Sequence, residues 1–186
     1  MGAPETTPSQ TVGPFFALPS GMLWPDGAQV VAEDRAGSFV LHGTLTDGNG
    51  DPVPDGIIEI WQADEQGRFD HPDDPRGQSS GWQGFGRCPT DAEGRFWFRT
   101  VKPGPLPTPS GEIEAPHIDV TVLARGMLNR AVTRVYFPDE GANDTDPVLA
   151  EVPLNRRSTL LAVADEQGLR FDIRLQGAGE TVFFAI

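Results

Sequence analysis

Proline and glycine interrupt this chain so often that long helices are excluded. Of its 186 residues, 18 are proline and 22 are glycine, and they occur along the whole length. Proline breaks a helix interior because it lacks a backbone donor, whereas glycine favours turns. Only 38% of the residues are hydrophobic. The composition therefore favours many short strands joined by turns, in a chain long enough for one compact domain.

The net charge and the cysteine count exclude several classes of partner and site. A net charge of -13 repels a phosphate backbone, so a nucleic-acid partner is excluded. No apolar run approaches about 18 residues and the first basic residue is Arg35, so we expect no membrane contact and a cytoplasmic protein. Cys88 is the only cysteine and is expected to be a buried thiol, which excludes an internal disulfide and a thiolate cluster.

The strand pattern predicts an all-β fold. Side chains alternate from Phe39 to Thr46, and residues 47–50 (Asp-Gly-Asn-Gly) have the composition of a turn. Further strands are expected at 56–63, 95–101, 117–124, 131–137, 168–175 and 181–184, with a short helix at 156–164. The strand at 56–63 is apolar on both faces and should be central. The expected fold is a β-sandwich of short, mostly antiparallel strands with long loops and an extended N-terminal segment.

Three segments lack a regular pattern. Residues 1–37 contain five prolines and are expected to form an extended arm that packs on a partner chain, with Phe15, Phe16 and Trp24 as anchors; residues 38–186 form the sandwich domain. Residues 64–86 form a loop too long to be kept without a function. Prolines between residues 103 and 116 are expected to exclude regular structure there.

Several runs, in order, resemble the intradiol dioxygenase family. They are 7–16 (TPSQTVGPFF), 47–50 (DGNG), 59–64 (EIWQAD), 85–87 (FGR), 100–105 (TVKPGP), 115–118 (APHI), 133–137 (TRVYF) and 170–177 (RFDIRLQG). The resemblance covers nearly the whole chain. It implies a β-sandwich, an Fe(III) centre, and insertion of O2 between the two hydroxyl-bearing carbons of an aromatic diol.

The chain is most similar to the metal-free, alpha-type chain of the two-chain members. The resemblance implies that the substrate is 3,4-dihydroxybenzoate (protocatechuate), that the product is 3-carboxy-cis,cis-muconate, and that the reaction belongs to aromatic catabolism by the beta-ketoadipate route. It also implies a partner in a hetero-oligomer: a beta-type chain whose two tyrosines and two histidines hold the Fe(III).

The matching positions in this chain lack ligand side chains. Ferric catecholate chemistry needs phenolate and imidazole ligands, and a His-x-His pair in a strand points both rings to one face. Here the pair is His117 and Asp119, and Leu106 stands where the iron-binding chain has tyrosine. The second tyrosine would come from the loop before Phe85, which contains none. The resemblance therefore predicts no iron and no complete catalytic site in this chain.

Two groups of residues remain as metal candidates. Tyr136 is the only tyrosine and is expected to be a strand aromatic with a hydrogen-bonded hydroxyl. A site of two histidines and one carboxylate could still be drawn from His42, His71 and His117, but no spacing brings them together. For His117, an ordinary pocket-lining or core imidazole beside Asp119 is the main expectation.

The resemblance also implies substrate contacts. Thr11, Gly13 and Pro14 are expected to line the aromatic cleft opposite the partner's iron, where glycine permits close approach and proline offers a rigid apolar face. A guanidinium suits the substrate carboxylate, and Arg134 matches the family position for it. The alternative for Arg134 is an ion pair. Surface or interface ion pairs are also expected for Arg125 and Arg130.

Two other functions are compatible with parts of the sequence. Residues 47–56 also resemble the opening hairpin of transthyretin-like and carboxypeptidase-regulatory-like modules, which are non-enzymatic β-sandwich binding modules. An active homomeric intradiol enzyme with an unusual ligand set is the other alternative. The run at 7–16 and the ending at 170–177 favour the metal-free dioxygenase chain over both.

Overall fold

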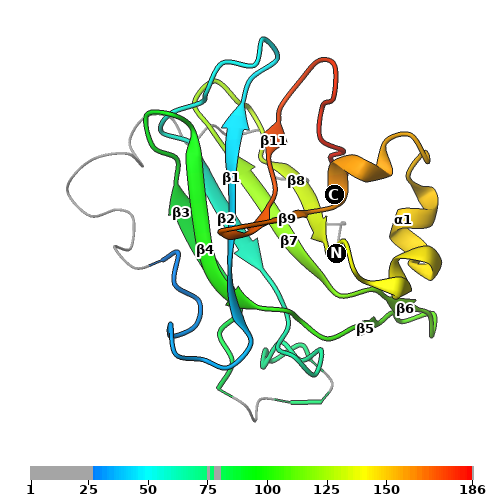
Figure 1. Cartoon of the computed structure of the whole chain (residues 1–186). Coiled ribbons are helices and arrows are strands. Elements are labelled where there is room, and N and C mark those ends of the chain that lie inside the picture. Colours follow the sequence, from blue (N-terminus) through cyan, green and yellow to red (C-terminus); the bar gives the residue numbers. More distant parts are fainter. Residues whose placement is uncertain (1–26, 75, 78–80, 186) are drawn as a thin grey trace, which may run out of the picture.

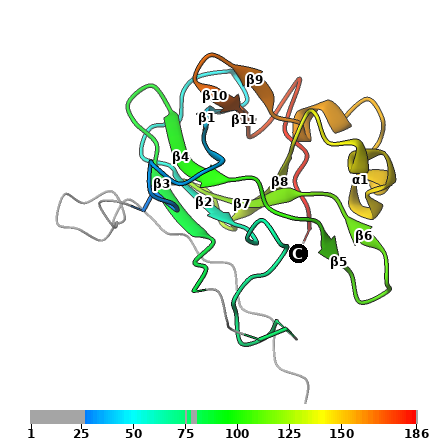
Figure 2. The same ribbon diagram turned by 60° about the horizontal axis from the view of Figure 1, so that its bottom comes forward.

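Two β-sheets packed face to face form the body of the protein (Figure 1). The computed structural model describes residues 27–74, 76–77 and 81–185. Figure 2 shows the two layers from the side, with the short helices gathered at one end. Six of the strand pairings are antiparallel and two are parallel. The predicted all-β sandwich of mostly antiparallel strands is confirmed.

The first sheet is built around its longest strand. It consists of β1 (Ser38–Thr46), β4 (Arg95–Val101), β9 (Val163–Asp165), β10 (Gly168–Arg170) and β11 (Ile173–Arg174). Strand β1 pairs antiparallel with β4 and, along its other side, in parallel with β10 and then β11. A Cβ atom at Gly43 would lie 1.9 Å from the carbonyl oxygen of Phe171, between β10 and β11. Only glycine fits this close backbone approach.

The second sheet carries the residues that matter for function. Its order is β3 (Phe85–Pro89), β2 (Ile57–Trp61), β7 (His117–Leu123), β8 (Ala131–Tyr136), and every pairing is antiparallel. The central place predicted for the strand at 56–63 is confirmed by β2. The inner faces of the two sheets enclose the core, which includes Leu41, Leu45, Ile58, Ile60, Phe98, Ile118, Val120, Val135 and Ile173.

Regular structure also occurs where prolines were expected to exclude it. Strands β5 (Leu106–Pro107) and β6 (Ile113–Glu114) form a small hairpin. The prediction for residues 103–116 was therefore wrong. A two-residue strand at an edge can include Pro107, because a missing N–H there costs little pairing.

The C-terminal part is more irregular than its residue pattern predicts. The strand expected at 168–175 is divided into β10 and β11, and the strand expected at 181–184 is absent from the described residues. Segment 181–184 instead makes single bonds to its neighbours, such as Phe184 N–H to the Val132 carbonyl at 2.8 Å. The helix expected at 156–164 is only the 3-10 turn η3 (Arg157–Leu160). Two unpredicted elements precede it, η2 (Gly141–Thr145) and α1 (Pro147–Glu151).

The described end of the N-terminal segment lies on the sandwich of its own chain. Val30 N–H donates to the carbonyl of Arg99 at 3.0 Å, and Arg99 N–H donates to the carbonyl of Ala28 at 2.9 Å. Ala28 and Val31 are buried. The rest of the predicted arm, including Thr11, Gly13, Pro14 and the three aromatic anchors, lies outside the described residues.

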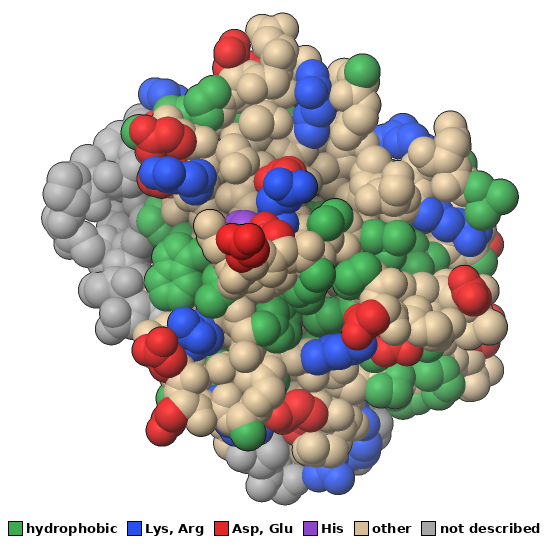
Figure 3. Space-filling view, in the orientation of Figure 1, with side chains coloured by type: hydrophobic (Ala, Val, Ile, Leu, Met, Phe, Trp, Pro, Cys, Tyr) green, Lys and Arg blue, Asp and Glu red, His purple; other side chains and the backbone are tan. Residues whose placement is uncertain are grey.

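The surface of the described part carries charges of both signs. On the face shown in Figure 3, acidic and basic side chains are interspersed and do not gather into one patch. Among the described residues, no helix has both the length and the apolar character needed to cross a membrane.

Candidate functional site: a buried ion cluster where a metal would lie

The predicted site residues that the structure describes meet at the end of the second sheet, because strand pairing aligns them. Asp119 on β7 lies directly opposite Arg134 on β8, and His117 lies opposite Tyr136. In the small hairpin, Leu106 pairs with Glu114, which lies three residues before His117. The structure thus brings together residues from four strands.

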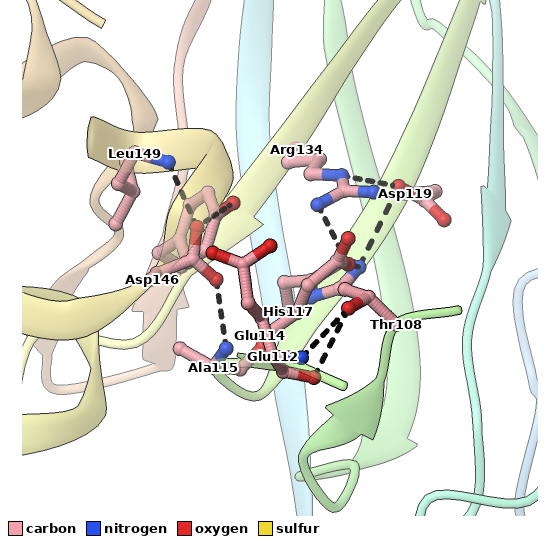
Figure 4. A network of polar contacts seen from close by, with 10 residues as sticks. Thr108, Glu112, Glu114, Ala115, His117, Asp119, Arg134, Asp146 and Leu149 are labelled. Atoms are coloured by element: carbon pink, nitrogen blue, oxygen red, sulfur yellow. Dashed lines mark hydrogen bonds and ion pairs between the residues drawn. The ribbon is translucent and has the colours of Figure 1, made fainter. Parts of the chain in front are cut away.

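Arg134 forms the centre of an ion cluster with two carboxylates (Figure 4). Its Nε donates to Asp119 Oδ1 at 2.9 Å, and its Nη1 donates to Glu114 Oε2 at 2.9 Å. The Arg134 side chain is only 19% exposed. Burial has the largest single effect and opposes its charge, but the combined effects of Asp119, Tyr136 and Glu114 outweigh burial, so the pKa of Arg134 lies above its usual value. The guanidinium therefore stays charged.

His117 lies next to this cluster and is fully buried, with 1% of its side chain exposed. Its Nδ1 is 2.7 Å from the carbonyl oxygen of Ala115. A carbonyl can only accept, so Nδ1 carries a proton and Nε2 faces the carboxylates. Nε2 lies 3.5 Å from Glu114 Oε2 and 3.8 Å from Asp119 Oδ1. The expected core imidazole beside Asp119 is confirmed.

Tyr136 is bound in a second buried network. Its hydroxyl donates to Asp146 Oδ1 at 3.1 Å, and burial raises the pKa of its phenol above the usual value. Asp146 Oδ1 also accepts from Leu149 N–H at 2.8 Å, and its Oδ2 accepts from Ala115 N–H at 2.7 Å. The prediction of a strand aromatic with a hydrogen-bonded hydroxyl is confirmed, and the protonated phenol is not a phenolate ligand.

A cavity of about 810 Å³ opens beside the cluster. Leu106 and Glu114 line one side, and Trp61, Phe69 and His71 line the other. The rings of Trp61 and Phe69 are stacked, with centroids 5.6 Å apart and planes 7° apart. Phe69 comes from the loop in which the resemblance places a tyrosine ligand. Leu106, at one place where the family uses tyrosine, and Phe69, from the loop that carries the other, both contribute apolar side chains to this cavity.

The residues present do not fit a ferric ion. Leu106 and Phe69 have no donor atoms, and the guanidinium of Arg134 is a cation that already binds the carboxylates of Glu114 and Asp119. In the described ranges, no three His, Cys, Asp or Glu side chains are placed to hold a metal ion. His42 instead contacts Asp165 at 3.1 Å and His71 contacts Asp73 at 3.6 Å.

The remaining predicted side chains have ordinary roles. Cys88 is a buried free thiol, as predicted, and burial raises its pKa. Arg125 lies 3.5 Å from Asp55 in an exposed ion pair. Arg130 lies with Arg134 on the wall of a separate, smaller cavity of about 390 Å³.

Two residues of these buried networks, Glu114 and Asp146, were not identified from the sequence. Glu114 gave no local signal, because its partner Arg134 is 20 residues away and on another strand. Asp146 did give one: an aspartate followed by Pro147 is a typical helix start, and the Asp146 side chain caps α1.

The amino-acid sequence of the chain was compared with known protein families and proteins. The dioxygenase family model matches residues 13–177. The chain is 44% identical to the protocatechuate 3,4-dioxygenase alpha chain of Burkholderia cepacia, over 98% of each chain. It is 33% identical to the beta chain of the same species, over 77% of this chain and 66% of the other.

Solved structures show the same fold. The dioxygenase domain of a dioxygenase carbohydrate-binding protein fusion from Streptomyces sp. SirexAA-E superposes with a TM-score of 0.61 and 26% identity, over 94% of this chain and 100% of that domain. A match of this extent decides against the transthyretin-like binding module. The chain belongs to the intradiol ring-cleavage dioxygenase family.

Proposed function

We propose that this chain is the metal-free alpha chain of a protocatechuate 3,4-dioxygenase. The enzyme adds O2 to 3,4-dihydroxybenzoate between its two hydroxyl-bearing carbons and forms 3-carboxy-cis,cis-muconate. The observation that carries the proposal is the set of side chains at Leu106, Asp119 and Arg134, which does not fit a ferric ion at the family's metal position, in a chain with full-length similarity to an alpha chain.

The proposal assigns the Fe(III) to a beta-type partner chain in a hetero-oligomer. When bound there, iron supplies the activation of the diol and of O2. This chain then supplies binding surface and not metal chemistry. A cytoplasmic location is part of the proposal, and the single free thiol of Cys88 agrees with a reducing compartment.

The direct test is co-expression with the beta-type chain. We expect turnover of 3,4-dihydroxybenzoate only in the co-purified complex, because neither half of the pocket is complete alone. The full-length chain purified by itself is the control. Ring cleavage by this chain alone, or failure of the two chains to co-purify, would contradict the proposal.

Within the complex, the proposed substrate contacts are Thr11, Gly13 and Pro14. Their small or rigid side chains suit a wall against the flat face of an aromatic ring. This assignment depends on the resemblance of the run at 7–16.

The resemblance makes Arg134 the proposed ligand of the substrate carboxylate, whereas its hydrogen bonds to Glu114 and Asp119 favour the ion-pair alternative. A substrate contact predicts that Arg134→Ala raises KM for 3,4-dihydroxybenzoate by about 10–100-fold. Turnover of catechol, which lacks the carboxylate, should then be unchanged. Equal loss on both substrates would assign Arg134 a structural role.

A further inference from the structure

The cavity of about 810 Å³ beside the ion cluster has aromatic walls. Trp61, the last residue of β2, is 37% exposed although its ring is largely apolar. The Phe69 ring stacks on it with centroids 5.6 Å apart, and the His71 ring meets its edge at 6.2 Å. Leu106 and Pro107 add apolar surface from β5. A cavity of this size and lining is typical of a site for a small aromatic molecule.

Hydrogen bonds to two enclosed aspartates hold the cavity walls in place. The side chain of Asp64, a residue only 4% exposed, accepts from two backbone N–H groups of the loop that carries Phe69, at 2.9 and 2.8 Å. Farther along this loop, Asp74 Oδ2 accepts from the Phe69 N–H at 3.2 Å. The Asp64 carbonyl accepts from Gly104 N–H at 2.8 Å, in the segment that leads to Leu106. Because Asp64 ties the two walls to each other, the cavity is formed before any ligand binds.

The charges of the lining decide which aromatic molecule fits. Among the described lining residues the only Lys or Arg side chain is Arg76, and its Nη2 is bonded to Asp74 Oδ2 at 2.8 Å. Asp73 and Glu114 add further carboxylates. A ligand carboxylate would lose its water beside like charges without a cation to pair with, which is costly. A phenol hydroxyl is uncharged at neutral pH and donates to a carboxylate, so a phenol suits this lining.

We propose that this cavity is a binding site for uncharged phenols: the ring packs against Trp61 and Leu106, and the hydroxyl donates to the carboxylate of Glu114. Glu114 takes this bond in addition to its bond with Arg134, because a carboxylate accepts several hydrogen bonds. Arg134 itself lines the separate cavity of about 390 Å³, so its proposed contact with the substrate carboxylate is unaffected. The inference goes beyond the proposed function, since it needs neither iron nor a partner chain.

The test compares three probes of similar size. Each is titrated with the full-length chain purified alone, and binding is followed by fluorine NMR. We expect 4-fluorophenol to bind with a Kd of about 0.1–1 mM, in the range for a ligand of one ring. 4-Fluorobenzoate should bind at least about 10-fold more weakly, because its carboxylate finds no unpaired Lys or Arg among the described lining residues. 4-Fluoroanisole, whose ether cannot donate a hydrogen bond, should also bind about 10-fold more weakly.

Variants of the lining locate the bound phenol. Trp61→Ala removes an aromatic wall and should weaken 4-fluorophenol binding by at least about 10-fold. Trp97→Ala is the matched control: Trp97 is 45% exposed and lines a different cavity of about 880 Å³, so its loss should leave the affinity unchanged. Leu106→Trp fills the cavity with a larger side chain and should also remove binding, which provides a second variant if Trp61→Ala does not fold.

Each result counts for or against the proposal. Absence of 4-fluorophenol binding up to about 10 mM, or equal affinity for 4-fluorophenol and either of the other probes, would overturn it. Equal weakening by Trp61→Ala and Trp97→Ala, or unchanged affinity in a folded Trp61→Ala or Leu106→Trp variant, would overturn it as well. The comparison of the three probes decides the proposal even if neither cavity variant folds. No readout involves ring cleavage, so failure of the proposed function and failure of this inference are distinguishable.

Discussion

Replacing Asp146 with alanine is expected to lower the free energy of unfolding by about 3–5 kcal/mol. The side chain is 1% exposed and accepts hydrogen bonds from three buried donors: Tyr136 Oη, Ala115 N–H and Leu149 N–H. Because these donors are buried, each would lose its hydrogen-bond partner. The loss should appear in denaturant unfolding followed by circular dichroism.

Matched variants distinguish the stability lost with the hydrogen-bond network from the stability lost by removing any acidic side chain. Asp144→Ala removes the same charge from an exposed position two residues away and should change stability by no more than about 0.5 kcal/mol. Asp146→Asn keeps one acceptor oxygen, so its loss in the free energy of unfolding should lie between those of Asp146→Ala and Asp144→Ala. A loss for Asp146→Ala no larger than for Asp144→Ala would contradict the role of Asp146 as a buried acceptor.

The position of Asp146 links this prediction to the site. It joins Tyr136 on β8 to Ala115, whose carbonyl holds the ring of His117. Damage to the network should therefore also disturb the ion cluster beside it.

The longer strands could be predicted because each buries one or both faces in the core. The alternation from Phe39 to Thr46 and the apolar run at 56–63 gave β1 and β2 their correct places. The shorter elements depend on distant contacts. The β5–β6 hairpin contains Pro107 and pairs through only two residues on each side, which no local pattern indicates. The helix α1 had a local signal in Asp146 and Pro147 that was not used.

The site could be predicted in part. The ligand changes at Leu106 and Asp119 were readable because the family runs around them are preserved in order. The pairing of Arg134 with Glu114 was not readable, because it joins residues on β8 and β6 whose proximity exists only after folding. The cavity wall formed by Trp61 and Phe69 depends in the same way on the folded course of the loop at 64–86.

The iron content of the full-length chain, expressed alone in iron-rich medium, tests the central claim most directly. Leu106, Asp119 and the guanidinium of Arg134 do not fit a ferric ion at the family's metal position, so elemental analysis should find no stoichiometric iron and the solution should lack the red absorption of ferric phenolate. Iron and colour should appear together only when the beta-type chain is co-purified. Stoichiometric iron in the chain purified alone would contradict this account.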